Sequence, residues 1–179
     1  MLQFITLTVA DILILDRAVL DEIWACWVNL RRQKLFKEVV ATLACLEIKR
    51  NEINWHPHLH LILIGGKKIS EDALSISWYK LTGNSYIVKN RPAGFSIFNL
   101  ITYSLKITEI QNAEDLRQLY SSIDNYRLLR GTGKLWGIKA SVSRVPAESF
   151  NNGPMNSFNI DATDLDEIIH NLDVLLGGI

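Results

Sequence analysis

A histidine-rich segment most constrains what this 179-residue chain can fold into. Three of the four histidines lie in His56-Pro57-His58-Leu59-His60, and an apolar run over 61–64 follows at once. Side chains two apart on an extended strand point to the same face, so we expect His58 and His60 to lie side by side. Two such imidazoles are a ready pair of metal ligands, and the alternative is a polar, solvated strand end.

The composition indicates one folded domain. A hydrophobic fraction of 48% and five tryptophans argue against disorder. Cys26 and Cys45 have no CxxC spacing and sit among apolar residues, so we expect buried thiols in a reducing compartment. No apolar run approaches the roughly 18 residues of a membrane span, and the start of the chain carries no basic leader region. We therefore expect a cytoplasmic protein without a membrane partner.

The charges are unevenly distributed although their sum is zero. All 19 Lys and Arg precede Val145, whereas six of the 19 acids follow it, so residues 1–144 carry +6 and the tail carries −6. A basic body is compatible with a phosphate-backbone partner and is also common in proteins that bind no nucleic acid. The change of charge at Val145 suggests a main domain over 1–144, then a linker and an acidic helix over 145–179.

The hydrophobic pattern predicts an α+β fold with a mainly antiparallel sheet and helices packed on it. The segments 45–50 and 56–64, joined by a polar turn over 51–54, indicate a β-hairpin. Asp16 and Ser70 are candidate helix caps. We predict further strands over 3–9, 86–89 and 134–138, and helices over 17–30, 35–43, 70–81, 95–107, 112–129 and 164–176.

Glu47 lies on the strand that precedes the histidines. If the hairpin pairs as predicted, Glu47 shares the face of His58 and His60, and these three side chains would leave open positions on a Mg²⁺ or Mn²⁺ ion. The alternative is a surface carboxylate paired with Lys49 or Arg50.

Tyr103 and Lys106 are three residues apart on a predicted helix and so lie on one surface. A tyrosine near a divalent ion can attack a phosphodiester, and an adjacent ammonium would lower the phenol pKa and stabilise charge on the phosphoryl group. The alternative is an amphipathic tyrosine at the edge of the core beside a solvated lysine.

Taken in order, these segments resemble the rolling-circle replication initiators (Rep proteins) of small bacterial plasmids, within the HUH endonucleases. The resemblance covers roughly residues 2–138, and its blocks are specific together although each is weak alone. The blocks are FITLTV (4–9), LEI (46–48) with WHPHLHL (55–61), LTGNSYIV (81–88), YSLK (103–106) and the stretch 126–136.

The resemblance implies a sheet of the HUH or ferredoxin/RRM-like type and a hydrolase-class nuclease that nicks and joins single-stranded or hairpin origin DNA. His58, His60 and Glu47 would bind the metal, and Tyr103, assisted by Lys106, would form a 5′-phosphotyrosine and free a 3′-OH for a host polymerase. No nucleotide cofactor is implied. A host helicase is an expected further partner, and a plasmid-encoded protein of the bacterial cytoplasm is the expected setting.

The same resemblance assigns supporting roles to other residues. The predicted DNA contacts are Lys89, Arg91, Arg130 and Lys134. His56 remains open as a third ligand, a hydrogen-bond donor to a ligand or a hinge before Pro57. Asn99 stands where these initiators usually carry a glutamate that activates water to end replication, and an amide cannot act as a general base. Nicking should survive this difference, whereas termination would need another residue.

Other readings of the blocks stay open. The chain begins directly at the first motif, which is compatible with a minimal catalytic domain, a truncated gene or a protein guided to its origin by a partner. A catalytically impaired DNA-binding regulator of the same family is the main alternative. A related relaxase or single-strand transposase is another, and a metal-dependent hydrolase of a different substrate would leave Tyr103 and Lys106 unexplained.

Overall fold

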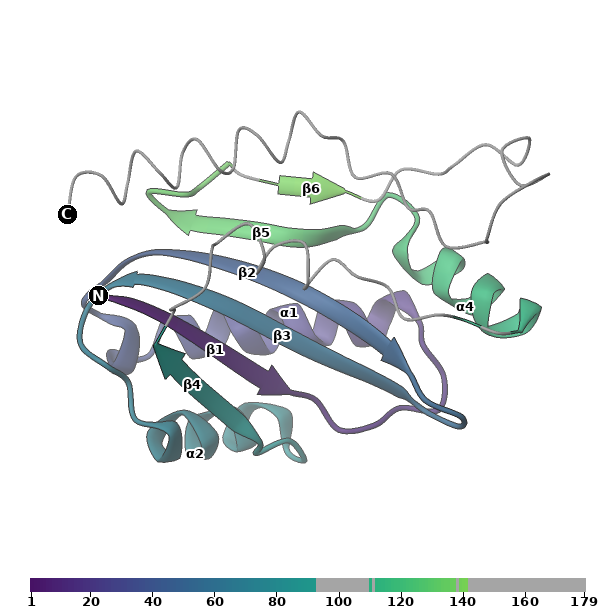
Figure 1. Ribbon diagram of the computed structural model, residues 1–179, viewed down its shortest axis with the longest axis horizontal. Coiled ribbons are helices and arrows are strands. Elements are labelled where there is room, and N and C mark those ends of the chain that lie inside the picture. The colour runs from purple at the N-terminus through teal and green to yellow at the C-terminus, as the bar shows by residue number, and fades with distance from the viewer. Residues whose placement is uncertain (93–109, 111, 138, 142–179) are drawn as a thin grey trace.

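The protein is an antiparallel sheet with helices packed on one of its faces. The computed structural model describes residues 1–92, 110, 112–137 and 139–141 (Figure 1). Within this part of the chain the sheet has six strands in the order β4-β1-β3-β2-β5-β6, and every neighbouring pair is antiparallel. The predicted α+β class with a mainly antiparallel sheet is therefore confirmed.

The elements follow one another along the chain with short connections. The strands are β1 (Leu2–Thr8), β2 (Val39–Arg50), β3 (Trp55–Gly65), β4 (Val88–Pro92), β5 (Arg127–Gly133) and β6 (Lys139–Ser141). The helices are α1 (Arg17–Arg31), the 3₁₀ turn η1 (Lys34–Phe36), α2 (Glu71–Thr82) and α4 (Ala113–Ile123). No described helix combines the length and the apolar character that crossing a bilayer would require.

The β2–β3 hairpin forms the centre of the sheet. The strands pair from Arg50 with Trp55 at the tip to Val39 with Gly65 at the far end, and the Asn51 side chain accepts hydrogen bonds from the backbone of Ile53 and Asn54 in the turn. The predicted hairpin is confirmed, and the predicted helix over 35–43 is wrong. Its first residues form only a 3₁₀ turn, because the β-branched residues that follow start β2 and pair with two neighbouring strands.

Two amphipathic helices cover one face of the sheet. Asp16 caps α1 by accepting a hydrogen bond from the Val19 amide at 2.8 Å, as the sequence predicts. One stripe of α1, including Trp24 and Trp27, is buried against the sheet, and α2 buries Trp78 on the same side. In Figure 1, α1 lies behind the sheet and α2 lies below it, next to the edge strand β4. This layer contains the principal hydrophobic core.

The chain after residue 110 departs most from the prediction. The helix expected over 112–129 ends at Ile123, and Asn125, in the left-handed region at φ 55°, turns the chain into β5. Residues 134–137 form a turn rather than the predicted strand, and β6 begins after it. Leu128 and Leu129 are both buried. Leu128 belongs to the core beneath the helices and Leu129 lies on the other side of the sheet, an alternation that a strand allows. In this conformation β5 pairs with β2.

The strand predicted over 86–89 is β4, shifted toward the C-terminus by a few residues. The predictions for the helix over 95–107, the linker over 145–158 and the acidic helix over 164–176 lie outside the described residues. The division of the chain at Val145 therefore stays a prediction.

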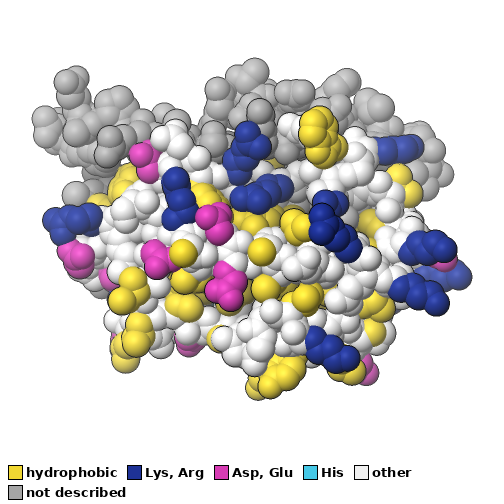
Figure 2. Space-filling model, turned by 180° about the vertical axis from the view of Figure 1, so that it is seen from behind, with side chains coloured by type: hydrophobic (Ala, Val, Ile, Leu, Met, Phe, Trp, Pro, Cys, Tyr) yellow, Lys and Arg dark blue, Asp and Glu magenta, His cyan; other side chains and the backbone are white. Residues whose placement is uncertain are grey.

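Alternation along the strands gives the sheet two different faces. Residues such as Leu7, Leu46 and Leu59 point toward α1 and α2 and belong to the core. The alternate residues form the opposite face, which we call the histidine face, and these residues include Phe4, Thr6 and Thr8 of β1, Cys45, Glu47 and Lys49 of β2, and His56, His58 and His60 of β3. The helix-covered side in Figure 2 accordingly shows no histidine side chain among its described residues.

Candidate metal and nucleic-acid site on the histidine face

The strand register brings the three predicted ligands together. Glu47 of β2 pairs directly with His58 of β3. His60 of β3 pairs with Cys45, which lies two residues before Glu47 on β2. Directly opposed residues of antiparallel strands share a face, and their diagonal neighbours lie within reach of long side chains. Glu47, His58 and His60 therefore form one cluster on the histidine face, as the sequence predicts.

Glu47 is a buried carboxylate with two basic partners. Its side chain is only 2% exposed, its Oε2 lies 2.8 Å from His60 Nε2, and the same oxygen lies 3.1 Å from Lys49 Nζ. Burial raises the pKa of this carboxyl, but the hydrogen bonds and charges of His60 and then of Lys49 outweigh burial, so the pKa lies below its ordinary value. The alternative prediction, a surface carboxylate paired with Lys49, is wrong about exposure because Glu47 is buried. It is right about the ion pair, because Lys49 does contact Glu47.

His60 is fixed in orientation from three sides. Its Nε2 contacts Glu47, and its Nδ1 lies 3.1 Å from the hydroxyl oxygen of Thr6, its cross-strand neighbour on β1. The ring also stacks on Phe4, with ring centroids 5.5 Å apart and an interplanar angle of 8°. Both ring nitrogens of His60 therefore have a hydrogen-bond partner on a neighbouring strand.

His58 differs from His60 because one of its nitrogens has no partner. The two rings are stacked with centroids 6.2 Å apart, and His58 Nδ1 is buried without a hydrogen bond within the structure. Burial lowers the pKa of His58 to about 4, against the opposing charge of Glu47. At neutral pH this imidazole is uncharged and keeps a lone pair available to a ligand.

His56 has its own partners at the edge of the cluster. Its Nδ1 contacts the carboxylate of Asp11, and its Nε2 contacts the side-chain amide of Asn51. Both ring nitrogens are thus directed to the loop after β1 and to the hairpin turn. The three roles left open for His56 do not include the one that these contacts favour, which is a structural connection between the hairpin and this loop.

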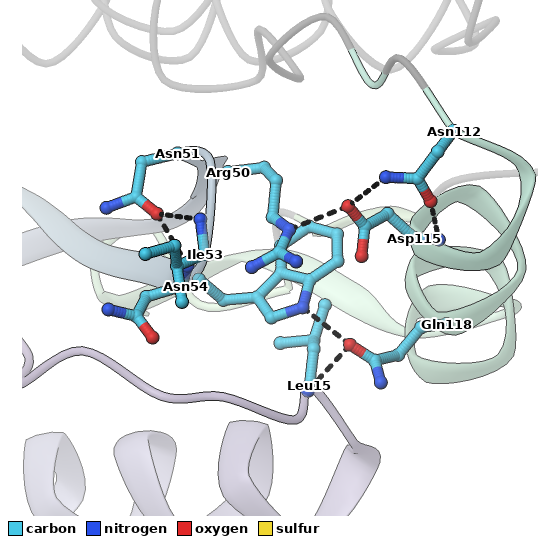
Figure 3. Close-up of polar contacts among 9 residues, drawn as sticks. Leu15, Arg50, Asn51, Ile53, Asn54, Asn112, Asp115 and Gln118 are labelled. Atoms are coloured by element: carbon cyan, nitrogen blue, oxygen red, sulfur yellow. Dashed lines mark hydrogen bonds and ion pairs between the residues drawn. The ribbon is translucent and has the colours of Figure 1, made fainter.

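The tip of the hairpin is held against α4, which fixes the strands that carry the histidines. Arg50 Nε lies 2.8 Å from Asp115 Oδ2, and the side-chain oxygen of Gln118 accepts hydrogen bonds from the Trp55 indole and the Leu15 amide (Figure 3). Hydrogen bonding to Arg50 lowers the pKa of Asp115, so this carboxylate stays ionised. Arg50, which the sequence offered as a partner of Glu47, therefore pairs with α4 instead.

The donor set suits a divalent ion, although no metal geometry is already formed. Within the described part of the chain, no group of three or more His, Cys, Asp or Glu side chains is arranged to hold an ion. Glu47 and His60 contact each other directly, and His58 adds a buried, unpartnered nitrogen beside them. Two imidazoles and a carboxylate are ligands that Mn²⁺ accepts, and Mg²⁺ also takes the carboxylate, so the chemistry of the cluster fits the predicted metal.

The predicted DNA contacts divide between two surfaces. Lys89 and Arg91 pair with Thr6 and Phe4, so both lie on the histidine face, where they are exposed at the sheet edge. Arg130 is on the helix-covered side, with its guanidinium 4.2 Å from the centre of the Trp24 ring. Lys134 is exposed in the turn between β5 and β6. Arg130 is therefore separated by the sheet from the cluster that Lys89 and Arg91 flank.

The remaining predicted site residues, Tyr103, Lys106 and Asn99, lie outside the described residues, so their roles stay predictions. Conversely, sequence reasoning missed Thr6 and Phe4 as the residues that orient His60. Their signal was present in the alternation of the first strand, but only the register of β1 against β3 assigns them to His60. Comparisons of the chain with protein-family models, curated proteins and solved structures find no significant match.

Proposed function

We propose that the protein is a metal-dependent endonuclease that nicks and joins single-stranded DNA in the manner of rolling-circle plasmid replication initiators. The observation that carries the proposal is the cluster of Glu47, His58 and His60 on the sheet face opposite α1 and α2. Exposed cations at the edge of the same face, Lys89 and Arg91, supply partners for a phosphate backbone. The nicking and joining reaction is inferred from the order of the sequence blocks, which resembles that of the replication initiators.

Each residue of the cluster has a distinct task in this proposal. Glu47, His58 and His60 would hold Mg²⁺ or Mn²⁺, and the bound ion would supply Lewis-acid polarisation of a phosphoryl oxygen. Thr6 hydrogen-bonds one nitrogen of His60 and leaves the other directed at Glu47, which fixes the ring. Lys49 contacts the same oxygen of Glu47 as His60 does, and the two together keep the pKa of this carboxyl below its ordinary value.

The covalent step is assigned to Tyr103. Its phenol oxygen would give up its proton and attack the scissile phosphorus, the bond from phosphorus to the 3′ oxygen would break, and the leaving oxygen would take up a proton from solvent in place of the one that the phenol released, becoming a 3′-OH. Lys106 would stabilise the negative charge on the phosphoryl group. The resulting 5′-phosphotyrosine keeps the bond energy for rejoining, and the 3′-OH would prime a host polymerase at a plasmid origin opened by a helicase.

The test is a search for the covalent adduct. The protein is incubated with Mn²⁺ and end-labelled single-stranded oligonucleotides that contain candidate origin hairpins, and the products are separated on a denaturing gel. We expect a shifted band that Tyr103→Phe abolishes and that His60→Ala nearly abolishes. Tyr86→Phe, which removes an exposed hydroxyl elsewhere, is the matched control and should leave the band intact. An adduct that persists in Tyr103→Phe would contradict the assignment of the nucleophile.

One observation favours a second candidate, a DNA-binding regulator of the same family that does not cut. The Glu47 carboxylate has two basic partners within the chain itself, His60 and Lys49. A regulator would bind the same oligonucleotides with an affinity independent of Mn²⁺ and would give no adduct in the same assay. A relaxase or single-strand transposase would instead form the adduct on its own target hairpins.

A further inference from the structure

One end of the sheet is strongly basic, and of its cations only Lys134 is among the DNA contacts that the sequence predicts. Three segments meet there, at 31–40, 65–68 and 133–137: Val39 pairs with Gly65, Ala41 pairs with Gly133, and Lys67 lies 3.9 Å from Glu38. We call this region the basic end. Its three segments contain seven cations and a single acid, Glu38; the cations are Arg31, Arg32, Lys34, Lys37, Lys67, Lys68 and Lys134.

Several cationic side chains are visible together at the right-hand edge of Figure 2, which corresponds to the edge of Figure 1 where the N-terminus lies. A group of like charges at this density attracts a polyanion and repels other cations. The charge therefore specifies the sign of the partner but not its chemical class.

An exposed tryptophan at the basic end specifies the class. Trp136 is 83% exposed, whereas the other four tryptophans of the chain are each at most 2% exposed. Leaving an indole in water forgoes the stabilisation that burial would give, and tryptophan is among the most buried residue types on average. Lys134 is two residues away in the same turn and is also exposed.

The turn presents Trp136 on a rigid support. Leu135 is 1% exposed and anchors the turn to the protein, and the amides of Leu135 and Trp136 donate to the carbonyls of Thr132 and Gly133 at 3.2 and 3.0 Å. Gly133, at φ +64°, approaches so closely that a Cβ atom there would lie 2.2 Å from the Val40 carbonyl oxygen. The indole is therefore held outward by a turn that the burial of Leu135 and the close approach of Gly133 to Val40 fix to the protein.

We propose that the basic end binds a single-stranded DNA segment, with Trp136 stacking on a base and the surrounding lysines contacting phosphates. Exposed aromatic rings among cations are the usual means of binding single strands without sequence preference. The inference rests on the proposed function for the kind of nucleic acid. The basic end lies about 20 Å along β2 from the level of His60, so it would hold DNA that flanks the cleaved site rather than the scissile phosphate.

The test uses the fluorescence of the full chain. An oligothymidylate of about 20 nucleotides, longer than the upper footprint of such sites, is titrated into the protein. Because four tryptophans are buried, stacking on Trp136 should quench only the long-wavelength part of the emission. Trp136→Phe should remove this quenching but keep a stacking ring, and Trp136→Ala should weaken binding roughly 5- to 100-fold by anisotropy of a labelled oligonucleotide.

The lysines are tested through the salt dependence of binding. Replacement of Lys67, Lys68 and Lys134 by glutamine should reduce the slope of log affinity against log salt by about 2 for a single strand. Lys80→Gln, an exposed lysine on α2 outside the basic end, is the matched control and should leave the slope within experimental error.

Several outcomes would overturn the inference. Binding by the wild type without quenching, or full affinity in Trp136→Ala, excludes stacking on Trp136, and tighter binding of oligouridylate would reassign the basic end to RNA. An adduct in the Tyr103 assay together with unquenched Trp136 would refute this inference and leave the nuclease proposal standing. Quenching that Trp136→Phe removes, without any adduct, would support the DNA segment at the basic end and remove the nicking reaction.

Discussion

The lowered pKa of His58 makes a measurable prediction about stability against pH in the metal-free protein. His58 titrates near its ordinary 6.5 in the unfolded chain and at about 4 in the folded protein. Between these two values the unfolded chain binds a proton that the folded protein does not. The contribution of His58 to the free energy of unfolding is therefore fully present above pH 6.5, and it is lost as the pH is lowered toward 4.

The magnitude follows from the size of the shift. At 1.36 kcal/mol per pKa unit, the shift from 6.5 to about 4 corresponds to an upper limit of ~3.4 kcal/mol. His58 is partly exposed, and solvent screening reduces this figure, so we expect about 2 kcal/mol to be lost between pH 7.5 and 4.5. The lowered pKa of Glu47 acts in a different window, because its contribution is lost only as the pH falls through a value below the ordinary one.

The assay is urea unfolding at 25 °C across this pH range, with a chelator in every sample. His58→Gln removes the titrating group, so its free energy of unfolding should change less with pH than that of the wild type, by about 2 kcal/mol over the range. Equal denaturant slopes for the two proteins would confirm that the comparison concerns the folded state. Parallel pH profiles for wild type and His58→Gln would refute the argument that burial keeps this histidine neutral.

Two further predictions concern the turn that carries Trp136 and the tip of the hairpin, and both are measured by urea unfolding. Gly133→Ala should lower the free energy of unfolding by about 3 kcal/mol, because the new Cβ meets the Val40 carbonyl oxygen at 2.2 Å. Gly83→Ala, at φ +76° with nothing within 4 Å, should lower it by only ~1 kcal/mol through backbone strain, and equal losses would contradict the close approach. Asp115→Asn should lower the free energy of unfolding by about 1 kcal/mol, because it weakens the bond to Arg50. Glu114→Gln, on the exposed face of α4, should lower it by less than ~0.5 kcal/mol. No loss of stability in Asp115→Asn would show that the hairpin tip does not depend on α4.

The centre of the candidate site could be predicted from the sequence because it depends on local rules. The period of two places His58 and His60 on one face, and the polar turn at Asn51 fixes a hairpin in which Glu47 pairs with His58. The structure confirms this arrangement. The burial of Glu47 could not be read from the same pattern, because a carboxylate on a strand is compatible with either face and with solvent.

The errors come from contacts between distant segments. β5 has a sequence that also suits the end of a helix, and its pairing with β2 from Ala41 to Cys45 decides the matter. His56 contacts Asp11, which is far away in sequence, so nothing near His56 could indicate that partner. In the same way the sequence predicts that Arg130 and Lys89 both contact DNA, and only the sheet register shows that they occupy opposite faces.

Manganese binding to the histidine face tests the central claim most directly. The free Mn²⁺ signal in electron paramagnetic resonance is followed as protein is added, with circular dichroism as the control for folding. We expect one ion per chain, lost in His60→Ala and Glu47→Gln and retained in His56→Ala, whose ring is committed to Asp11 and Asn51. A folded wild type that leaves the Mn²⁺ signal unchanged, or a binding site that His60→Ala leaves intact, would contradict the proposal.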